Sequence, residues 1–191
     1  MIETLAVIFT IIDVWLTTKR HILTWPVGII GVILYGIVFW NSRLYSDFGL
    51  QFVFLAQSIV GWITWSRHLE DDKTHTRVTC MTPKEMAYWF SGGIWAYIIL
   101  AIVMKKYTNA AVPWVDSFVA VFSLIANWLL AKRKLENWYV WILANTIYVG
   151  LFLYKGLYLS SVLYAGLIYL DIVGLKDWTK KLKEQFLMFK S

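Results

Sequence analysis

The sequence has one cysteine, three prolines and few charged residues among its 191 positions. The single cysteine, Cys80, excludes a disulfide framework and a cysteine-rich zinc or iron–sulfur site held by this chain alone. Charged residues make up 16% of the chain, where about 25% is usual in a soluble domain. The chain lacks the glycine-rich loop ending in Lys-Ser or Lys-Thr that cradles phosphates, which excludes ATP hydrolysis by that route.

The three histidines, His21, His68 and His75, all fall in polar stretches between apolar runs. A histidine proton relay or metal site within an apolar segment is therefore unsupported, and we expect neither a metal nor a cofactor. No nucleophile lies beside a candidate base in a recognisable motif, so we expect a protein that is not an enzyme.

What the sequence has in excess is apolar and aromatic residues. Hydrophobic residues make up 59% of the chain, with 12 Trp, 11 Tyr and 11 Phe. A soluble domain of this composition would expose apolar patches far beyond the few hundred Å² that monomers tolerate, so we expect lipid to be the solvent. Amphipathic aromatic rings collect at the membrane interface, and we assign Trp65 and Trp178 to that belt.

Apolar runs of about 20 residues, the length that crosses a bilayer, occur seven times. We predict an all-α polytopic membrane protein with transmembrane helices near residues 3–18, 22–41, 47–66, 84–104, 113–131, 138–155 and 159–178. The apolar start lacks a basic region of the kind that opens a cleavable signal peptide, so we interpret it as a retained first span.

The distribution of positive charge predicts the orientation. With seven spans, fourteen of the 18 Lys and Arg residues fall on one side, and only Arg43, Lys105, Lys106 and Lys155 fall on the other. The positive-inside rule makes the richer side cytoplasmic. We therefore expect the N-terminus outside and the C-terminus inside, and we interpret the net charge of +6 as a sign of orientation rather than of nucleic-acid binding.

The chain resembles itself when Trp15 is aligned with Trp128. Without a gap, 16 of 51 aligned pairs between residues 15–65 and 128–178 are identical, where composition alone would give roughly a tenth. We predict a 3+1+3 parallel repeat, because one extra crossing between two three-helix units restores their direction. Parallel repeats about an axis along the membrane normal are a transporter architecture that includes the SWEET carriers. A duplication that merely built a stable scaffold is the alternative.

The repeat divides the chain into four parts. Residues 3–66 form a first three-helix bundle, and residues 67–112 form a cytoplasmic loop plus a linker helix near 84–104. Residues 113–178 form the second bundle, and residues 179–191 form a basic amphipathic tail that we expect to contact anionic lipid.

Polar residues inside spans are candidate functional residues, because they are costly in lipid unless they face other helices or water. In the sixth span, helical spacing puts Trp138, Trp141, Asn145, Tyr148 and Phe152 on one stripe, which suits stacking of a flat ligand around one amide. An ordinary interhelical seam is the alternative.

The second span repeats this stripe with Trp25, Tyr35 and Phe39, but Gly28 replaces Trp141 and Val32 replaces Asn145. We therefore expect an asymmetric ligand that one bundle recognises more than the other.

The remaining polar candidates lie on the third, fifth and seventh spans. They are Gln51, Gln57, Ser58, Ser123, Asn127, Tyr164 and Asp171. An ionised Asp171 would favour a cation, although a carboxyl that only bridges helices is equally compatible with the sequence. We assign Asp13 to structural packing, and Asp116 to the wet end of a span.

Several motifs of the chain together resemble the PnuC family of vitamin transporters. They are Trp138-X-X-Trp141-X-X-X-Asn145, Lys155-Gly156-Leu157-Tyr158, Gly174-X-X-X-Trp178, Trp25-Pro-Val-Gly-Ile-Ile-Gly, Leu44-Tyr45 and Gly61-Trp62-X-X-Trp65. The resemblance covers residues 5 to 180, and it makes Trp138, Trp141 and Asn145 the family's motif positions.

This resemblance implies a bacterial inner-membrane facilitator for nicotinamide riboside, assembled as a homotrimer. It also implies uncoupled uptake, with a cytoplasmic kinase that traps the product by phosphorylation. Similar proteins move thiamine, riboflavin or deoxynucleosides, so these substrates stay open. A non-transporting membrane scaffold or sensor is the remote alternative.

Overall fold

The computed structural model describes residues 2–41, 45–71, 77–108, 112–154 and 158–188, and within them the chain is all-helical. The described helices are α1 (Ile2–Thr18), α2 (Thr24–Asn41), α3 (Tyr45–Asp71), α4 (Pro83–Tyr107), α5 (Pro113–Ala131), α6 (Asn137–Tyr154) and α7 (Tyr158–Met188). The predicted all-α class is confirmed. Four of these helices have the length and apolar composition to cross a membrane, in the segments Thr24–Asn41, Phe48–Arg67, Pro83–Tyr107 and Pro113–Ala131.

Helices α1, α6 and α7 differ from one another in length and composition. Helix α1 has 17 residues, which is the short end of the spanning range. Helix α6 carries polar and aromatic side chains that lower its hydropathy, and several of these face the interior described below. Helix α7 continues unbroken to Met188, so residues 179–188 extend the last helix beyond the predicted end at 178.

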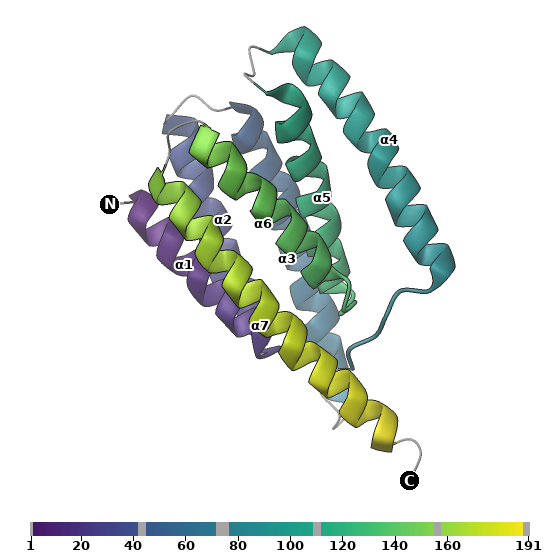
Figure 1. The fold of residues 1–191 in the computed structure, drawn as a ribbon. Coiled ribbons are helices and arrows are strands. Elements are labelled where there is room, and N and C mark those ends of the chain that lie inside the picture. The colour runs from purple at the N-terminus through teal and green to yellow at the C-terminus, as the bar shows by residue number, and fades with distance from the viewer. Residues whose placement is uncertain (1, 42–44, 72–76, 109–111, 155–157, 189–191) are drawn as a thin grey trace.

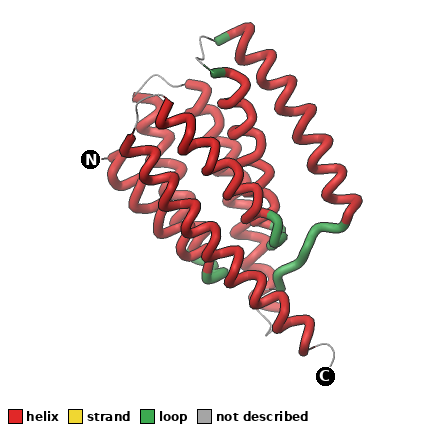
Figure 2. Tube along the Cα trace, viewed as in Figure 1, coloured by secondary structure: helices red, strands yellow, loops and turns green. Residues whose placement is uncertain are grey.

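The helices are connected by contacts that leave α4 at the edge (Figure 1). Consecutive helices pack within α1–α2–α3 and within α5–α6–α7, and the two groups meet through α1 with α7 and through α3 with α5. Among the described helices α4 packs against α5 alone, and Figure 2 shows the loop that leads into it.

Helix α4 begins with a capping box. The hydroxyl of Thr82 accepts from the backbone N–H of Glu85, the Glu85 carboxylate accepts from the N–H of Thr82, and Pro83 occupies the first turn. These contacts satisfy N–H groups that have no partner within a helix start. The preceding segment is fixed by backbone bonds of Thr79 to Arg133 and Leu135, in the turn between α5 and α6.

Two turns at the same end of the molecule have matching geometry. Arg20, between α1 and α2, and Arg133, between α5 and α6, adopt left-handed φ angles of 55° and 54°. Each turn is closed by an equivalent backbone bond, from His21 N to Leu16 O at 3.0 Å and from Lys134 N to Leu129 O at 2.9 Å. Arg20 and Arg133 are also equivalent positions when residues 15–65 are aligned with residues 128–178.

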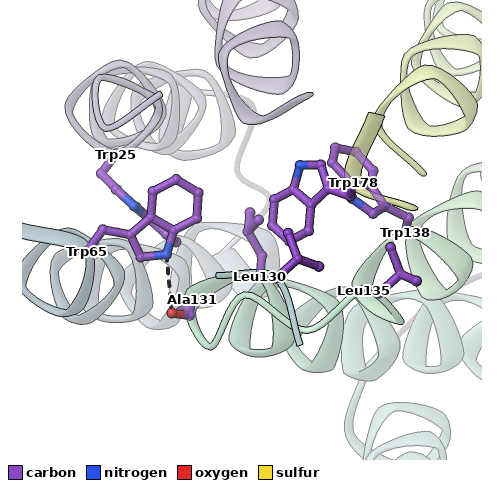
Figure 3. Packing of buried hydrophobic residues seen from close by; sticks show 8 residues of the cluster. Trp25, Trp65, Leu130, Ala131, Leu135, Trp138 and Trp178 are labelled. Carbon is purple, nitrogen blue, oxygen red and sulfur yellow. Dashed lines mark hydrogen bonds between the residues drawn. The ribbon is translucent and has the colours of Figure 1, made fainter. Parts of the chain in front are cut away.

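The core at this end is a cluster of four tryptophans, Trp25, Trp65, Trp138 and Trp178, packed with Leu130, Ala131 and Leu135 (Figure 3). Trp25 meets Trp65 edge to face at 5.3 Å, and Trp138 meets Trp178 in the same way at 5.5 Å. The assignment of Trp65 and Trp178 to an interfacial belt is wrong, because their side chains are 2% and 0% exposed.

The indole N–H groups of Trp65 and Trp178 each have a hydrogen-bond partner in the core. Trp65 donates to the carbonyl of Ala131 at the end of α5, and Trp178 donates to the carbonyl of Thr17 at the end of α1. The last carbonyls of a helix have no intrahelical donor. Trp65 supplies a donor to the Ala131 carbonyl, whereas the Thr17 carbonyl accepts from the N–H of Arg20 as well as from Trp178. Each bond also joins the two helix groups.

Candidate functional site

A cavity of about 260 Å³ lies between the two helix groups. Residues from α1, α2, α3, α5, α6 and α7 line it, and none from α4 does so among the described residues. The volume is near the lower limit of ligand pockets, about 300 Å³, which suits one vitamin-sized molecule. The lining residues are Thr10, Asp13, Val14, Thr17, Gly28, Gly31, Val32, Tyr35, Phe39, Leu50, Gln51, Phe54, Ser58, Ser123, Asn127, Leu130, Trp138, Trp141, Asn145, Tyr148, Tyr164, Leu167 and Asp171.

Helix α6 supplies the aromatic wall of the cavity. Trp138, Trp141, Asn145 and Tyr148 all line it, as their spacing of three and four residues predicts. The ring of Tyr148 packs against that of Tyr164 from α7, with centroids 4.7 Å apart. The fifth residue of the predicted stripe, Phe152, lies on α6, but its side chain is outside the described residues.

A buried amide–acid pair joins α6 to α7 at this wall. Asn145 Nδ2 donates to Asp171 Oδ2 at 2.7 Å, and the two residues are 4% and 2% exposed. Asn145 therefore holds the Asp171 side chain in one orientation, while both residues still line the cavity. This pair unites two candidates that the sequence analysis placed on separate helices.

A second polar group connects α3 and α5. Asn127 lines the cavity and donates to Gln57 Oε1 at 3.1 Å, and Gln57 Nε2 donates to the carbonyl of Leu124 at 3.2 Å. Gln57 itself does not line the cavity, so the structure gives it a supporting position behind Asn127. Gln51, Ser58 and Tyr35, also candidates from the sequence, line the cavity.

Trp25 also differs from its predicted place. It does not line the cavity but belongs to the tryptophan cluster, where it is 3% exposed. The cause is Gly61, since a Cβ there would lie 2.2 Å from Trp25 Cη2. Trp138 occupies the matching hole over Gly174, yet it reaches the cavity as well.

Asp13 is a cavity residue that the sequence analysis assigned to packing. It lines the cavity from α1, and its carboxylate accepts a hydrogen bond from the Thr24 hydroxyl. The signal that could have identified it is an acid in an apolar segment, which is a functional candidate by default. Thr10, Thr17 and Phe54 also line the cavity and were not predicted.

The acidic and basic side chains that line the cavity are unevenly represented, because acids are present and bases are not found among the described residues. Asp13 and Asp171 are its acidic side chains, and no Lys, Arg or His is found among the described residues that line it. In the described part of the chain, no group of three or more His, Cys, Asp or Glu side chains could hold a metal ion. An acidic cavity with aromatic walls can bind a flat cation by charge, stacking and hydrogen bonds.

Many lining positions occur in pairs that are equivalent when the chain is aligned with itself, Trp15 on Trp128. Tyr35 corresponds to Tyr148, Thr10 to Ser123, Gln51 to Tyr164 and Ser58 to Asp171. Both members of each pair face the same cavity. The cavity is therefore built from equivalent faces of the two helix groups.

Comparisons with known proteins agree with this arrangement. The family model described as nicotinamide mononucleotide transporter matches residues 1–180. The nicotinamide riboside transporter PnuC of Escherichia coli strain K12 is 26% identical over 208 residues, covering 96% of this chain and 87% of the relative. The riboflavin/roseoflavin transporter RibM of Streptomyces davaonensis is 27% identical over 176 residues, covering 90% of this chain and 81% of the relative.

A solved structure has a similar fold. The crystal structure of the vitamin B3 transporter PnuC superposes with a TM-score of 0.76 at 22% identity, covering 96% of this chain and 82% of that one.

Proposed function

The chain belongs to the nicotinamide mononucleotide transporter family, and the nicotinamide riboside transporter PnuC is similar to it. We propose that the chain carries nicotinamide riboside across the bacterial inner membrane. The observation that carries this proposal is the acidic, aromatic cavity between the helix groups. Nicotinamide riboside combines a flat cationic ring with sugar hydroxyls. Such a molecule needs a stacking face, negative charge and hydrogen-bonding groups in one small space.

The binding roles divide among the cavity walls. Trp141 offers the face on which the ring stacks, with Tyr148 and Tyr164 beside it. Asn145 and Asp171 offer hydrogen bonds at the same wall, and Asn127 and Gln51 offer amides across the cavity for the sugar hydroxyls.

The transport cycle proceeds by rocking of two parallel three-helix repeats about the cavity, in a 3+1+3 arrangement related to that of the SWEET carriers. The matching turns at Arg20 and Arg133 and the paired lining positions support it. Helix α4 serves as the linker that restores the direction of the second repeat. The N-terminus lies outside and the C-terminus in the cytoplasm, as the charge distribution favours.

Uptake is uncoupled, and a cytoplasmic kinase traps the substrate by phosphorylation. The chain has no phosphate-binding loop to couple transport to ATP. It assembles as a homotrimer, which light scattering of the detergent-solubilised protein tests directly.

Proteoliposomes test the function. With a nicotinamide riboside kinase and ATP inside, they should accumulate labelled nicotinamide riboside, and without the kinase the label should only equilibrate. Trp141→Ala and Asn145→Ala should each reduce initial flux at least tenfold, because the first removes the stacking face and the second removes the amide that binds Asp171. Asp116→Asn is the matched control outside the cavity. Intact flux in both alanine variants would contradict the proposed site and favour a scaffold or sensor.

Riboflavin is the second candidate, because a similar protein carries the name of a riboflavin transporter. Its three-ring system demands more volume than a single pyridinium ring, which disfavours it in a cavity of about 260 Å³. Parallel assays with riboflavin and thiamine, each with its own kinase, distinguish the substrates. Accumulation of either vitamin without that of nicotinamide riboside would reassign the substrate within the family.

A further inference from the structure

The carboxylate of Asp13 is held in a fixed position at the cavity wall formed by α1 and α2. The Thr24 hydroxyl contacts Asp13 Oδ1, and it lies 3.0 Å from the Asp13 backbone carbonyl. The Thr17 hydroxyl in turn contacts that of Thr24. Asp13 is therefore oriented by neutral hydroxyl groups, and none of these contacts supplies a positive charge.

A glycine makes room for this carboxylate. A Cβ on Gly28 would lie 3.0 Å from Asp13 Oδ2, which is tighter than ordinary contact. At the equivalent positions of the second helix group stand Ala126, which is fully buried, and Trp141, which lines the cavity. One helix group thus has an acid and a glycine at the two positions where the other has an alanine and an indole.

The two acids of the cavity differ in their surroundings. Asp171 is 2% exposed and accepts a hydrogen bond from Asn145. Asp13 is less deeply buried and lines the cavity with a hydroxyl as its partner. A carboxylate in a space of low polarity without a cationic partner is stabilised when a cation enters.

We propose that Asp13 is a specificity-determining residue, which selects a positively charged ring over a neutral ring of the same shape. The ring stacks on Trp141, while the Asp13 carboxylate supplies the counter-charge from α1. The two helix groups then have different roles in binding, because α5–α7 provides the aromatic face of Trp141 and α1–α3 provides the charge of Asp13. This inference rests on the proposed transport of nicotinamide riboside.

Calorimetric titration of the purified full-length protein tests it with two ligands. Nicotinamide riboside is a cation, and its reduced dihydro form is neutral with nearly the same shape. The wild type should bind the cation at least tenfold more tightly than the neutral form. Asp13→Asn, which keeps an oxygen that accepts from Thr24, should weaken cation binding at least tenfold and change binding of the neutral form less than twofold.

The controls separate the possible failures. Asp116→Asn removes an acid outside the cavity and should leave both affinities unchanged. Equal losses for both ligands in Asp13→Asn, or no loss for either, would overturn the role of Asp13. If the wild type binds neither ligand, the proposed function fails instead. Should Asp13→Asn not fold, the smaller neutral variant Asp13→Ser takes its place, and a loss confined to the cation is again required.

Discussion

At the scale of single residues, two glycines determine where two tryptophans lie. Gly61 leaves the hole that Trp25 fills, and Gly174 leaves the hole that Trp138 fills, with would-be Cβ contacts of 2.2 and 2.3 Å. The indole rings then stand edge-on to Trp65 and Trp178. One missing side chain in each helix group therefore makes room for an indole ring.

Gly174→Ala should destabilise the protein, because the added methyl group must displace the Trp138 ring. Overpacking of this kind costs about 1–3 kcal/mol of unfolding free energy. Gly166→Ala on the same helix is the matched control, since no atom lies within 4 Å of its would-be Cβ. Thermal unfolding in detergent measures both variants. Equal midpoints would show that the Trp138 ring is free to move aside.

At the scale of elements, residues 77–82 before α4 are held against the turn between α5 and α6 by hydrogen bonds. Thr79 donates its N–H to Arg133 O at 3.1 Å and accepts from Leu135 N at 2.8 Å. Val78 beside it is 3% exposed and belongs to the tryptophan cluster. Lys134 adds an ion pair to Glu85 at 3.1 Å. The start of α4 is thus attached to the α5–α6 turn.

Thr79→Pro should loosen this attachment, because proline has no N–H to donate to Arg133. The lost hydrogen bond is worth about 0.5–1.5 kcal/mol. Hydrogen exchange should then rise in residues 77–82 and at the amide of Leu135. Thr79→Val keeps the N–H and is the control. Unchanged exchange in the proline variant would mean that side-chain packing alone holds the loop.

At the scale of the whole molecule, each of the two helix groups, α1–α3 and α5–α7, donates a hydrogen bond to a helix end of the other. Trp178 on α7 donates to the end of α1, and Trp65 on α3 donates to the end of α5. Arg133 adds a further contact between the two groups, because its guanidinium lies 5.0 Å from the Trp65 ring and donates to the Trp65 carbonyl within α3. Burial lowers the pKa of this guanidinium. These contacts close one end of the interface beside the cavity.

The native Cys80 tests the orientation without any mutation, since it is the sole cysteine and is exposed. A membrane-impermeant maleimide should label it in inside-out vesicles and not in right-side-out ones. Partial burial of the thiol and the charge of Glu136 raise the pKa of Cys80. The reactive thiolate is therefore scarcer than usual at neutral pH, and labelling should accelerate at a higher pH than for a free cysteine peptide.

Asn41→Cys in a Cys80→Ser background is the mirror control for this experiment. Asn41 is exposed at the end of α2, which a topology of alternating helices places on the other side of the membrane. It should be labelled in right-side-out vesicles. Labelling of Cys80 from outside would reverse the proposed orientation.

The helical periodicity of the sequence predicted which residues of α6 share one face. The contacts between helices depend on tertiary packing, which the sequence did not show. The α6 stripe is a local property, because residues three and four apart share a helix face whatever surrounds them. The contact between Asn145 and Asp171 depends on how α6 packs on α7. Gln57 and Trp25 were assigned to the cavity because sequence reveals that a side chain is polar or aromatic, but not which neighbour it faces.

The sequence by itself determined the solvent, the helical class and the family of this protein. Apolar composition and helical periodicity are local properties of the chain. A bilayer stabilises an apolar helix directly, because all its backbone hydrogen bonds are made within the helix. Only the tertiary structure decided that Trp65 and Trp178 are core residues and that Asp13 belongs to the cavity. These outcomes depend on the holes at Gly61, Gly174 and Gly28 and on the carbonyls at the ends of α1 and α5. Such features arise only when helices distant in sequence pack together.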